Sequence, residues 1–162
     1  MKFVIDANVL IDMAYAGGLW VLPRLGKLIL LDVVLAECLE HPKQPTLAVD
    51  VEKAGIKTIL VPKSIYEEAE KYKRASLSWP DTIAFYWALK HKAILLTNEK
   101  ALRRIGQEYK VHCRGTIWVL NEARAKSLAC HEDINKWAAV LLDMAEERRL
   151  PARELEKFLM PN

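Results

Sequence analysis

Short apolar runs alternate with helix-patterned segments along almost the whole 162-residue chain. The runs have the length and composition of strands and cover residues 3–5, 27–32, 56–61, 93–97 and 110–113. Because the connections between them are short, consecutive strands should be parallel and joined by right-handed crossovers. The alternation therefore predicts an α/β fold with three layers, α/β/α, around a parallel sheet of about five strands.

Helical patterns fill the segments between the runs. The predicted helices cover residues 9–16, 33–40, 46–54, 64–75, 80–91, 99–109, 117–126, 134–149 and 151–158. Ser64 with Glu67, and Ser78 with Asp81, have the spacing of capping boxes at helix starts. Gly55 is expected to end its helix as the C′ residue.

No linker divides the chain, so we expect a single domain over residues 1–162. A loop that contains Pro42 and Pro45 is its clearest interruption. No strand follows the last two predicted helices. Residues 127–162 are therefore interpreted as a helical appendage, packed on the sheet or on a second subunit.

Composition favours a self-sufficient core in a reducing setting. A chain of this length can bury roughly 70% of its unfolded surface. The three cysteines have no zinc-type spacing and cannot all pair with one another. No secretory signal and no apolar run long enough to cross a membrane is found, so a cytoplasmic location away from membranes is expected.

The net charge of +3 is weakly basic. Basic residues cluster at 71–74, 90–92, 103–104 and 148–149. Such clusters are usually solvated helix faces, but they also suit contacts with phosphate groups. The charge permits a nucleic-acid partner without requiring one.

Acidic and amide side chains follow the predicted strands or open the helices beside them. They are Asp6, Glu37, Asp81 and the pair Asn98-Glu99. Because parallel strands end at one edge of the sheet, these side chains should meet in one crevice. Two carboxylates about 4 Å apart repel by about 4 kcal/mol at an effective dielectric constant near 20, and a bound cation would relieve this. Oxygen ligands of this kind favour Mg²⁺ or Mn²⁺.

Each of these residues also has a purely structural interpretation. Asp6 and Asn8 are good helix N-caps. Asp81 fits a capping box, Glu37 fits an exposed helix position, and Glu99 fits the positive end of a helix dipole. Their joint placement along the chain is what favours a metal site.

Five segments together resemble the PIN-domain ribonucleases. They are residues 4–11 (VIDANVLI), 34–37 (VLAE), 77–81 (LSWPD), 95–99 (LLTNE) and 111–116 (VHCRGT). The resemblance covers essentially the whole chain. It looks closest to the bacterial VapC-type toxins and to similar small PIN proteins that end in two extra helices.

The resemblance implies a sheet order of 3-2-1-4-5 and a metal site made of acids. Three acidic positions of the family's site match Asp6, Glu37 and Asp81. The fourth position usually ends a Thr-x-Asp run, which here reads Thr97-Asn98-Glu99. Glu99 keeps the charge on a longer side chain, whereas Asn98 offers a neutral oxygen, and both are candidate ligands.

The implied activity is metal-dependent hydrolysis of RNA phosphodiester bonds with Mg²⁺ or Mn²⁺. Asp6, Glu37, Asp81 and Glu99 would be the catalytic and metal-binding residues, with Asn98 as a further ligand. Asn8 and Thr97 would support them, and Arg103 and Arg104 would contact the RNA backbone. The implied partners are a second copy of the chain and a small antitoxin protein.

Two other functions remain open at this level. A phosphatase of the haloacid-dehalogenase type would need Asp-x-Asp after the first strand, where this chain has Asp6-Ala7-Asn8. A PIN fold that has lost catalysis and serves RNA or protein binding is the stronger alternative. Asn98 motivates it.

Overall fold

The computed structural model describes residues 1–41 and 44–161, so Pro42 lies outside the described residues. Five parallel strands form one sheet in the order β3-β2-β1-β4-β5. The strands are β1 (Lys2–Ile5), β2 (Lys27–Leu31), β3 (Thr58–Ile59), β4 (Ile94–Leu96) and β5 (Cys113–Arg114). The expected order is confirmed, and β1 and β4 are neighbours at the point where the order reverses.

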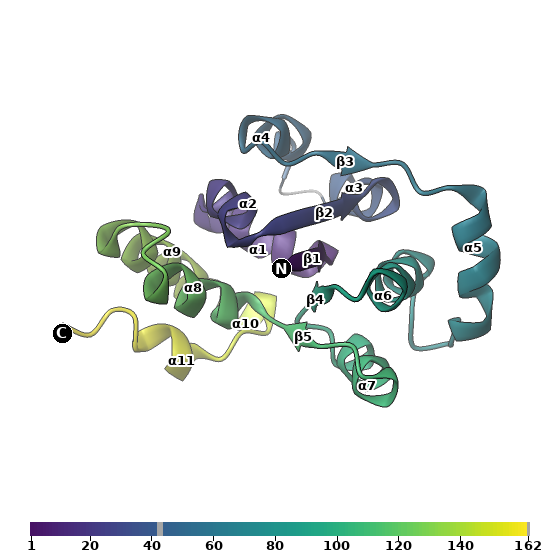
Figure 1. Ribbon diagram of the computed structural model, residues 1–162. Coiled ribbons are helices and arrows are strands. Elements are labelled where there is room, and N and C mark those ends of the chain that lie inside the picture. The colour runs from purple at the N-terminus through teal and green to yellow at the C-terminus, as the bar shows by residue number, and fades with distance from the viewer. Residues whose placement is uncertain (42–43, 162) are drawn as a thin grey trace.

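Helices cover both faces of the sheet (Figure 1). They are α1 (Ala7–Ala16), α2 (Leu22–Leu25), α3 (Asp32–Leu39), α4 (Leu47–Lys53), α5 (Lys63–Ala69), α6 (Trp79–His91), α7 (Lys100–Tyr109), α8 (Thr116–Ala125), α9 (His131–Asp143), α10 (Ala145–Arg148) and α11 (Ala152–Glu156). Two 3₁₀ helices, η1 (Leu19–Val21) and η2 (Glu70–Tyr72), complete the set. In the view of Figure 1, α5, α6 and α7 lie to the right of the sheet, and α1, α2, α8 and α9 lie to its left. The α/β class is confirmed.

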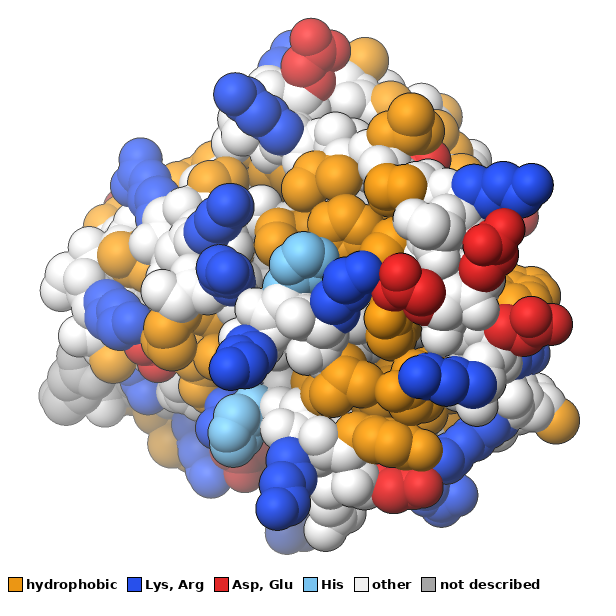
Figure 2. Space-filling view, turned by 45° about the vertical axis from the view of Figure 1, so that its right-hand side comes forward, with side chains coloured by type: hydrophobic (Ala, Val, Ile, Leu, Met, Phe, Trp, Pro, Cys, Tyr) orange, Lys and Arg blue, Asp and Glu red, His pale blue; other side chains and the backbone are white. Residues whose placement is uncertain are grey.

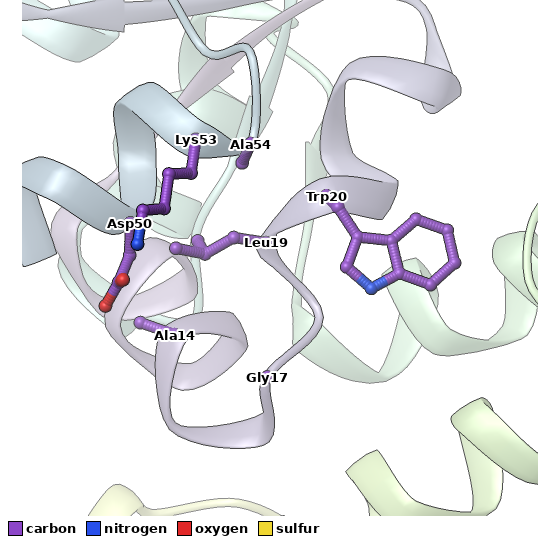
Figure 3. A pocket seen from close by; sticks show the side chains of 7 residues that line it. All are labelled: Ala14, Gly17, Leu19, Trp20, Asp50, Lys53 and Ala54. Atoms are coloured by element: carbon purple, nitrogen blue, oxygen red, sulfur yellow. The ribbon is translucent and has the colours of Figure 1, made fainter.

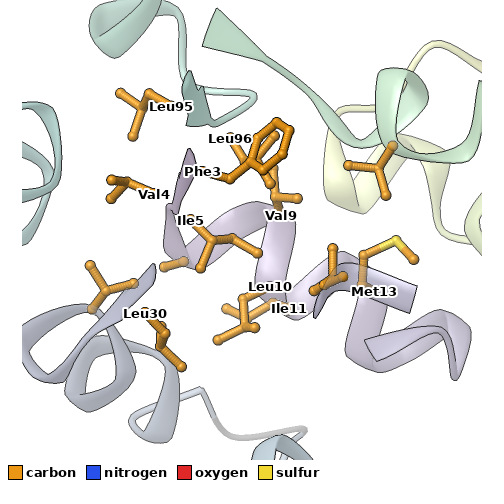
Figure 4. Close-up of a cluster of buried hydrophobic side chains, with 14 of the residues drawn as sticks. Phe3, Val4, Ile5, Val9, Leu10, Ile11, Met13, Leu30, Leu95 and Leu96 are labelled. Atoms are coloured by element: carbon orange, nitrogen blue, oxygen red, sulfur yellow. The ribbon is translucent and has the colours of Figure 1, made fainter. Parts of the chain in front are cut away.

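The core lies around β1, which is the central strand. Phe3, Val4 and Ile5 are fully buried, and buried residues of α1 and β4 surround them (Figure 4). A strand covered on both faces can be apolar at every position, which explains the unbroken run at residues 3–5. The core therefore fixes the end of β1, where Asp6 follows.

Several predicted boundaries were wrong, each for a local reason. Ser64 lies inside α5, whose N-cap is Pro62, so the predicted capping box at Ser64 does not form. The fifth strand begins at Cys113 instead of residue 110, because Lys110 takes a left-handed conformation that ends α7. The predicted helix 134–149 is divided at Met144 into α9 and α10.

Other local predictions are confirmed. Ser78 and Asp81 form the predicted capping box at the start of α6. Gly55 has a φ of 76°, as expected for a residue that ends a helix in the left-handed conformation.

The C-terminal helices pack on the chain's own core. Helix α9 contacts α1 and α8, and α11 contacts α9. The Trp137 ring on α9 lies edge-on to the Trp20 ring, with 5.4 Å between the ring centroids. Close contact also requires Gly18, since a Cβ there would lie 2.9 Å from the Trp137 ring. The C-terminal helices thus pack on helices of the same chain.

Basic side chains are dispersed on the surface. On the face in Figure 2, Lys and Arg side chains are spread between hydrophobic side chains instead of forming one cluster.

Among the described residues, Cys38, Cys113 and Cys130 are free thiols. Burial raises the pKa of Cys38 to about 12, so this thiol stays protonated. Within the described part of the chain, no helix is long and apolar enough to cross a membrane.

Candidate active site

Asp6 occupies the carboxyl end of the central strand and is 2% exposed. It takes an extended conformation and caps α1, because its Oδ1 accepts a hydrogen bond of 2.8 Å from the Ala7 N–H. Its Oδ2 accepts a second hydrogen bond of 2.8 Å from the Thr97 hydroxyl, which follows β4. The Asp6 carboxylate therefore caps α1 and is also held by Thr97, which follows the adjacent strand β4.

Asp81 lies in the first turn of α6. Its carboxylate accepts from the Ser78 N–H at 3.2 Å, and the Ser78 hydroxyl accepts from the Asp81 N–H at 3.1 Å. Pro80 lies within this turn, where its missing N–H leaves no hydrogen bond unmade. The capping box fixes the position of Asp81 without using all of its carboxylate oxygens.

Glu37 and Glu99 come from two other elements. Glu37 projects from α3 and is exposed, whereas Glu99 is the half-buried N-cap of α7. The Asn8 amide donates a hydrogen bond to Glu99 Oε1, and the Thr97 hydroxyl accepts from the Glu99 N–H at 3.0 Å. Asn8 and Thr97 therefore each form a hydrogen bond with a carboxylate of the predicted set.

The four carboxylates influence one another electrostatically. Burial, and then the charges of Asp81 and Glu37, raise the pKa of Asp6 to about 7. Burial, and then Asp81 and Glu99, raise the pKa of Glu37. Burial raises the pKa of Asp81, hydrogen bonds from Ser78 lower it, and Glu99 raises it again. The pKa of each of Asp6, Glu37 and Asp81 is thus raised by at least one other acid of the predicted set.

A divalent cation fits the chemistry of this donor set. All of its donors are carboxylate oxygens, which hard cations prefer, and a cation would offset their repulsion. As the side chains stand, no group of three or more His, Cys, Asp or Glu among the described residues could hold a metal ion. Ligation therefore requires the carboxylates to draw together from their present rotamers.

Asn98 belongs to a different network. Its Nδ2 donates to Asp12 Oδ2 and to the Thr116 hydroxyl, both at 2.9 Å, and its Oδ1 accepts from the Thr116 N–H at 3.0 Å. The amide thus uses both of its hydrogens and an oxygen lone pair. The structure does not bring this side chain into the acidic group, which Glu99 completes instead.

Asp12 and Arg148 form a buried ion pair that the sequence analysis did not identify. Arg148 Nε lies 2.7 Å from Asp12 Oδ1, and the two side chains are 10% and 0% exposed. Arg148 also donates to the Asn8 carbonyl at 3.2 Å. An acid between Ile11 and Met13 on an apolar helix was the available signal for a buried partner. Nothing near Arg148 distinguishes it from a solvated charge.

The two arginines predicted to contact RNA have different positions. Both are exposed on α7, but Arg103 Nη2 donates to the Thr97 carbonyl at 3.0 Å. A cavity of about 610 Å³ beside this edge is bordered by Asn8, Glu99 and residues of the C-terminal segment. Neither Arg103 nor Arg104 is among the residues that line it.

A second cavity lies away from the acidic group. It measures about 400 Å³ and lies between the end of α1 and α4 (Figure 3). Leu19, Trp20, Asp50 and Lys53 line it, and none of the predicted site residues does. The chemistry of the candidate site is therefore concentrated at the carboxyl ends of the strands.

Comparisons with known proteins agree with this fold. No curated protein matches the chain. A crystal structure of PAE2754 from Pyrobaculum aerophilum is similar, with a TM-score of 0.53 and 17% sequence identity, over 76% of this chain and 90% of that one. The model of the family DUF3368, described as a PIN domain, matches residues 2–160. The chain therefore belongs to the PIN-domain family.

Proposed function

We propose that this protein is a metal-dependent endoribonuclease that hydrolyses RNA phosphodiester bonds with Mg²⁺ or Mn²⁺. The observation that carries the proposal is the buried Asp6, whose pKa is raised to about 7 by burial and by Asp81 and Glu37. Burying one carboxylate beside two others costs folding free energy. Carboxylates with pKa values perturbed in this way are concentrated at functional sites. PIN domains are generally nucleases and typically depend on divalent metals, which agrees with this use.

Asp6, Asp81 and Glu99 would hold the metal. When bound, the cation lowers the pKa of water and offsets charge that develops on the phosphate. The chain's own groups then orient the ligands. Thr97 holds Asp6, Ser78 holds Asp81, and Asn8 holds Glu99.

Glu37 is the member best suited to accept a proton. It is the most exposed of the four acids, and its raised pKa moves its basicity towards neutral pH. We assign it the role of general base for the attacking water, with Asp6, Asp81 and Glu99 as ligands. Asn98 acts indirectly, because its hydrogen bonds fix the loop that presents Glu99.

Cleavage of a labelled single-stranded RNA tests the proposal. Purified protein is incubated with Mg²⁺, Mn²⁺ or EDTA, alongside the variants Asp6→Asn and Asp81→Asn. Asp143→Asn, an exposed change at the end of α9, is the matched control. Metal-dependent cuts should vanish in both site variants and persist in the control.

Two results would argue against this function. Unchanged cleavage by the Asp6→Asn variant would show that the site is wrongly assigned. Tight RNA binding without cleavage by well-folded wild-type protein, across several RNAs and both metals, would favour the non-catalytic binding module.

We further propose that the nuclease is the toxin of a toxin–antitoxin pair, acts as a homodimer in the cytoplasm and is inhibited by a small protein that covers the acidic cleft. This rests on the likeness to VapC-type toxins in the acidic motifs and the helical C-terminal extension. Leu19 and Leu22 are buried in the core, and Trp20 stays partly exposed. Growth arrest on expression that the Asp6→Asn change abolishes would support the toxin role.

A further inference from the structure

A hollow of about 380 Å³ lies beside β5 and the C-terminal segment. Figure 1 shows α10 and α11 next to the end of β5, so residues distant in the sequence meet here. Ile117, Trp118, Leu150 and Pro151 form its apolar part. Its volume is within the range of about 300–1,000 Å³ that is usual for binding sites of small organic groups.

Three arginines surround this apolar part: Arg103, Arg114 and Arg149. All three are exposed, and none forms an ion pair with a carboxylate in the described part of the chain. Glu154 also borders the hollow, but it is paired with Lys157 at 2.9 Å. The hollow therefore presents unpaired positive charge to an incoming ligand.

Trp118 gives the hollow a flat and well-anchored aromatic group. The side chain is half-buried on α8, and its ring packs against Phe3 with 5.8 Å between the centroids. Phe3 is fully buried in the core, so the Trp118 ring is supported from within. A base that stacks on such an aromatic ring gains about 1–3 kcal/mol.

The hollow is next to the cavity that Glu99 borders. Asn98 and Arg149 line both the hollow and the 610 Å³ cavity beside Glu99. Arg149 ends α10 in a left-handed conformation, at the turn between α10 and α11. Arg149 therefore lies at the border between the cavity beside Glu99 and the hollow that contains Trp118.

We propose that this hollow is a binding subsite for single-stranded RNA, next to the site of cleavage. One unstacked base packs against Trp118 and Ile117, while Arg103, Arg114 and Arg149 contact the flanking phosphates. A duplex does not fit the requirement, because its bases are stacked and its grooves do not offer a free base face. The inference rests on the proposed function, since it identifies the form of RNA that the acidic site would cut.

RNA binding in a background that does not cut separates this subsite from catalysis. Every protein carries Asp6→Asn, and a fluorescent single-stranded RNA is titrated in Mg²⁺ at several salt concentrations. Arg114→Gln and Arg149→Gln should each weaken binding and lower the slope of log K against log salt by about 0.7, the loss of one phosphate contact. Arg153→Gln and Lys53→Gln, changes at exposed basic residues outside the hollow, should leave the slope unchanged.

Trp118→Leu tests the base contact and keeps an apolar side chain against Phe3. It should weaken binding by about 5- to 150-fold without changing the salt slope, because stacking involves no phosphate. Trp118→Phe, which retains a ring, should restore most of the affinity. Thermal unfolding of each variant checks that the fold is kept.

The inference is overturned if the Arg114 and Arg149 variants match the controls, or if duplex RNA binds as tightly as single-stranded RNA. Normal metal-dependent cleavage by protein with wild-type Asp6, together with such a result, would leave the proposed function standing and remove only the subsite. Absence of both binding and cleavage would overturn the two together.

Discussion

Replacing Asp6 with asparagine should stabilise the metal-free protein while it abolishes cleavage. The pKa of Asp6 is raised from 3.8 to about 7 in the folded chain, a difference of about 3 units. At 1.36 kcal/mol per unit, the ionised carboxylate costs the folded state about 4 kcal/mol. Because the folded chain binds this proton more tightly, stability falls as pH rises from about 4 to about 7, and the full cost is present above pH 7.

Asparagine removes this charge and keeps the local hydrogen bonds. Its Oδ1 can still accept from the Ala7 N–H, so the cap of α1 is retained. Its Nδ2 replaces the oxygen that accepted from Thr97, and the rotatable hydroxyl can accept instead of donating. The gain at pH 8 should therefore approach about 4 kcal/mol, and even half of it would raise Tm by about 4–8 °C in a protein of this size.

Thermal unfolding at pH 5 and pH 8, with EDTA or with Mg²⁺, measures these effects. In EDTA the variant should exceed the wild type clearly at pH 8 and by much less at pH 5. Mg²⁺ should raise the Tm of the wild type more than that of the variant, because a ligand that binds only the folded state stabilises it. Asp143→Asn should shift stability by no more than about 0.5 kcal/mol. A variant less stable than the wild type at pH 8 in EDTA would refute the reasoning.

Three further changes test the network behind the acids. Asn98→Asp should destabilise the protein and not increase RNA cleavage, because it sets a second carboxylate against Asp12; higher activity in the cleavage assay would instead make position 98 a ligand. Arg148→Met should cost about 3–5 kcal/mol in a urea titration, since it leaves the Asp12 charge buried without its partner, and a change below about 1 kcal/mol would contradict that role. Gly115→Ala should lower both Tm and cleavage, because the added Cβ would lie 2.7 Å from Arg103 Nη2 and closer still to Asn98 Oδ1; unchanged cleavage would show that this contact can yield freely.

Local sequence patterns were sufficient for the α/β class, whereas the order of the strands came from the resemblance to PIN domains. The apolar run at residues 3–5 is unbroken because both of its faces are buried, and this makes the central strand easy to recognise. Asp6 is the next residue after β1 and Glu99 is the third residue after β4, so parallel topology places them at one edge. Ser78 and Asp81 were found from spacing alone, because a capping box involves only neighbouring residues.

Contacts between distant residues set the limit of prediction. Arg148 meets Asp12 across 136 positions of sequence, and no local pattern encodes such a pair. The sequence suggested that Asn98 is a neutral substitute for an acidic metal ligand. Its hydrogen-bond partners, Asp12 and Thr116, are remote in the chain, so no local pattern revealed them. The start of the fifth strand was predicted wrongly for a different reason. Lys110 ends α7 in a left-handed conformation, a position for which glycine is the usual sequence signal.

The ion pair between Asp12 and Arg148 also sets the order in which the site can be completed during protein synthesis. The first helix emerges from the ribosome early, but the guanidinium that holds it and the Asn8 carbonyl lies in α10, close to the end of the chain. Until that residue has emerged, the Asp12 carboxylate has no cation to bury against, and the strand end that carries Asp6 and Asn8 lacks its final support. The acidic edge is thus finished only after Arg148 has been made, 136 residues later than Asp12.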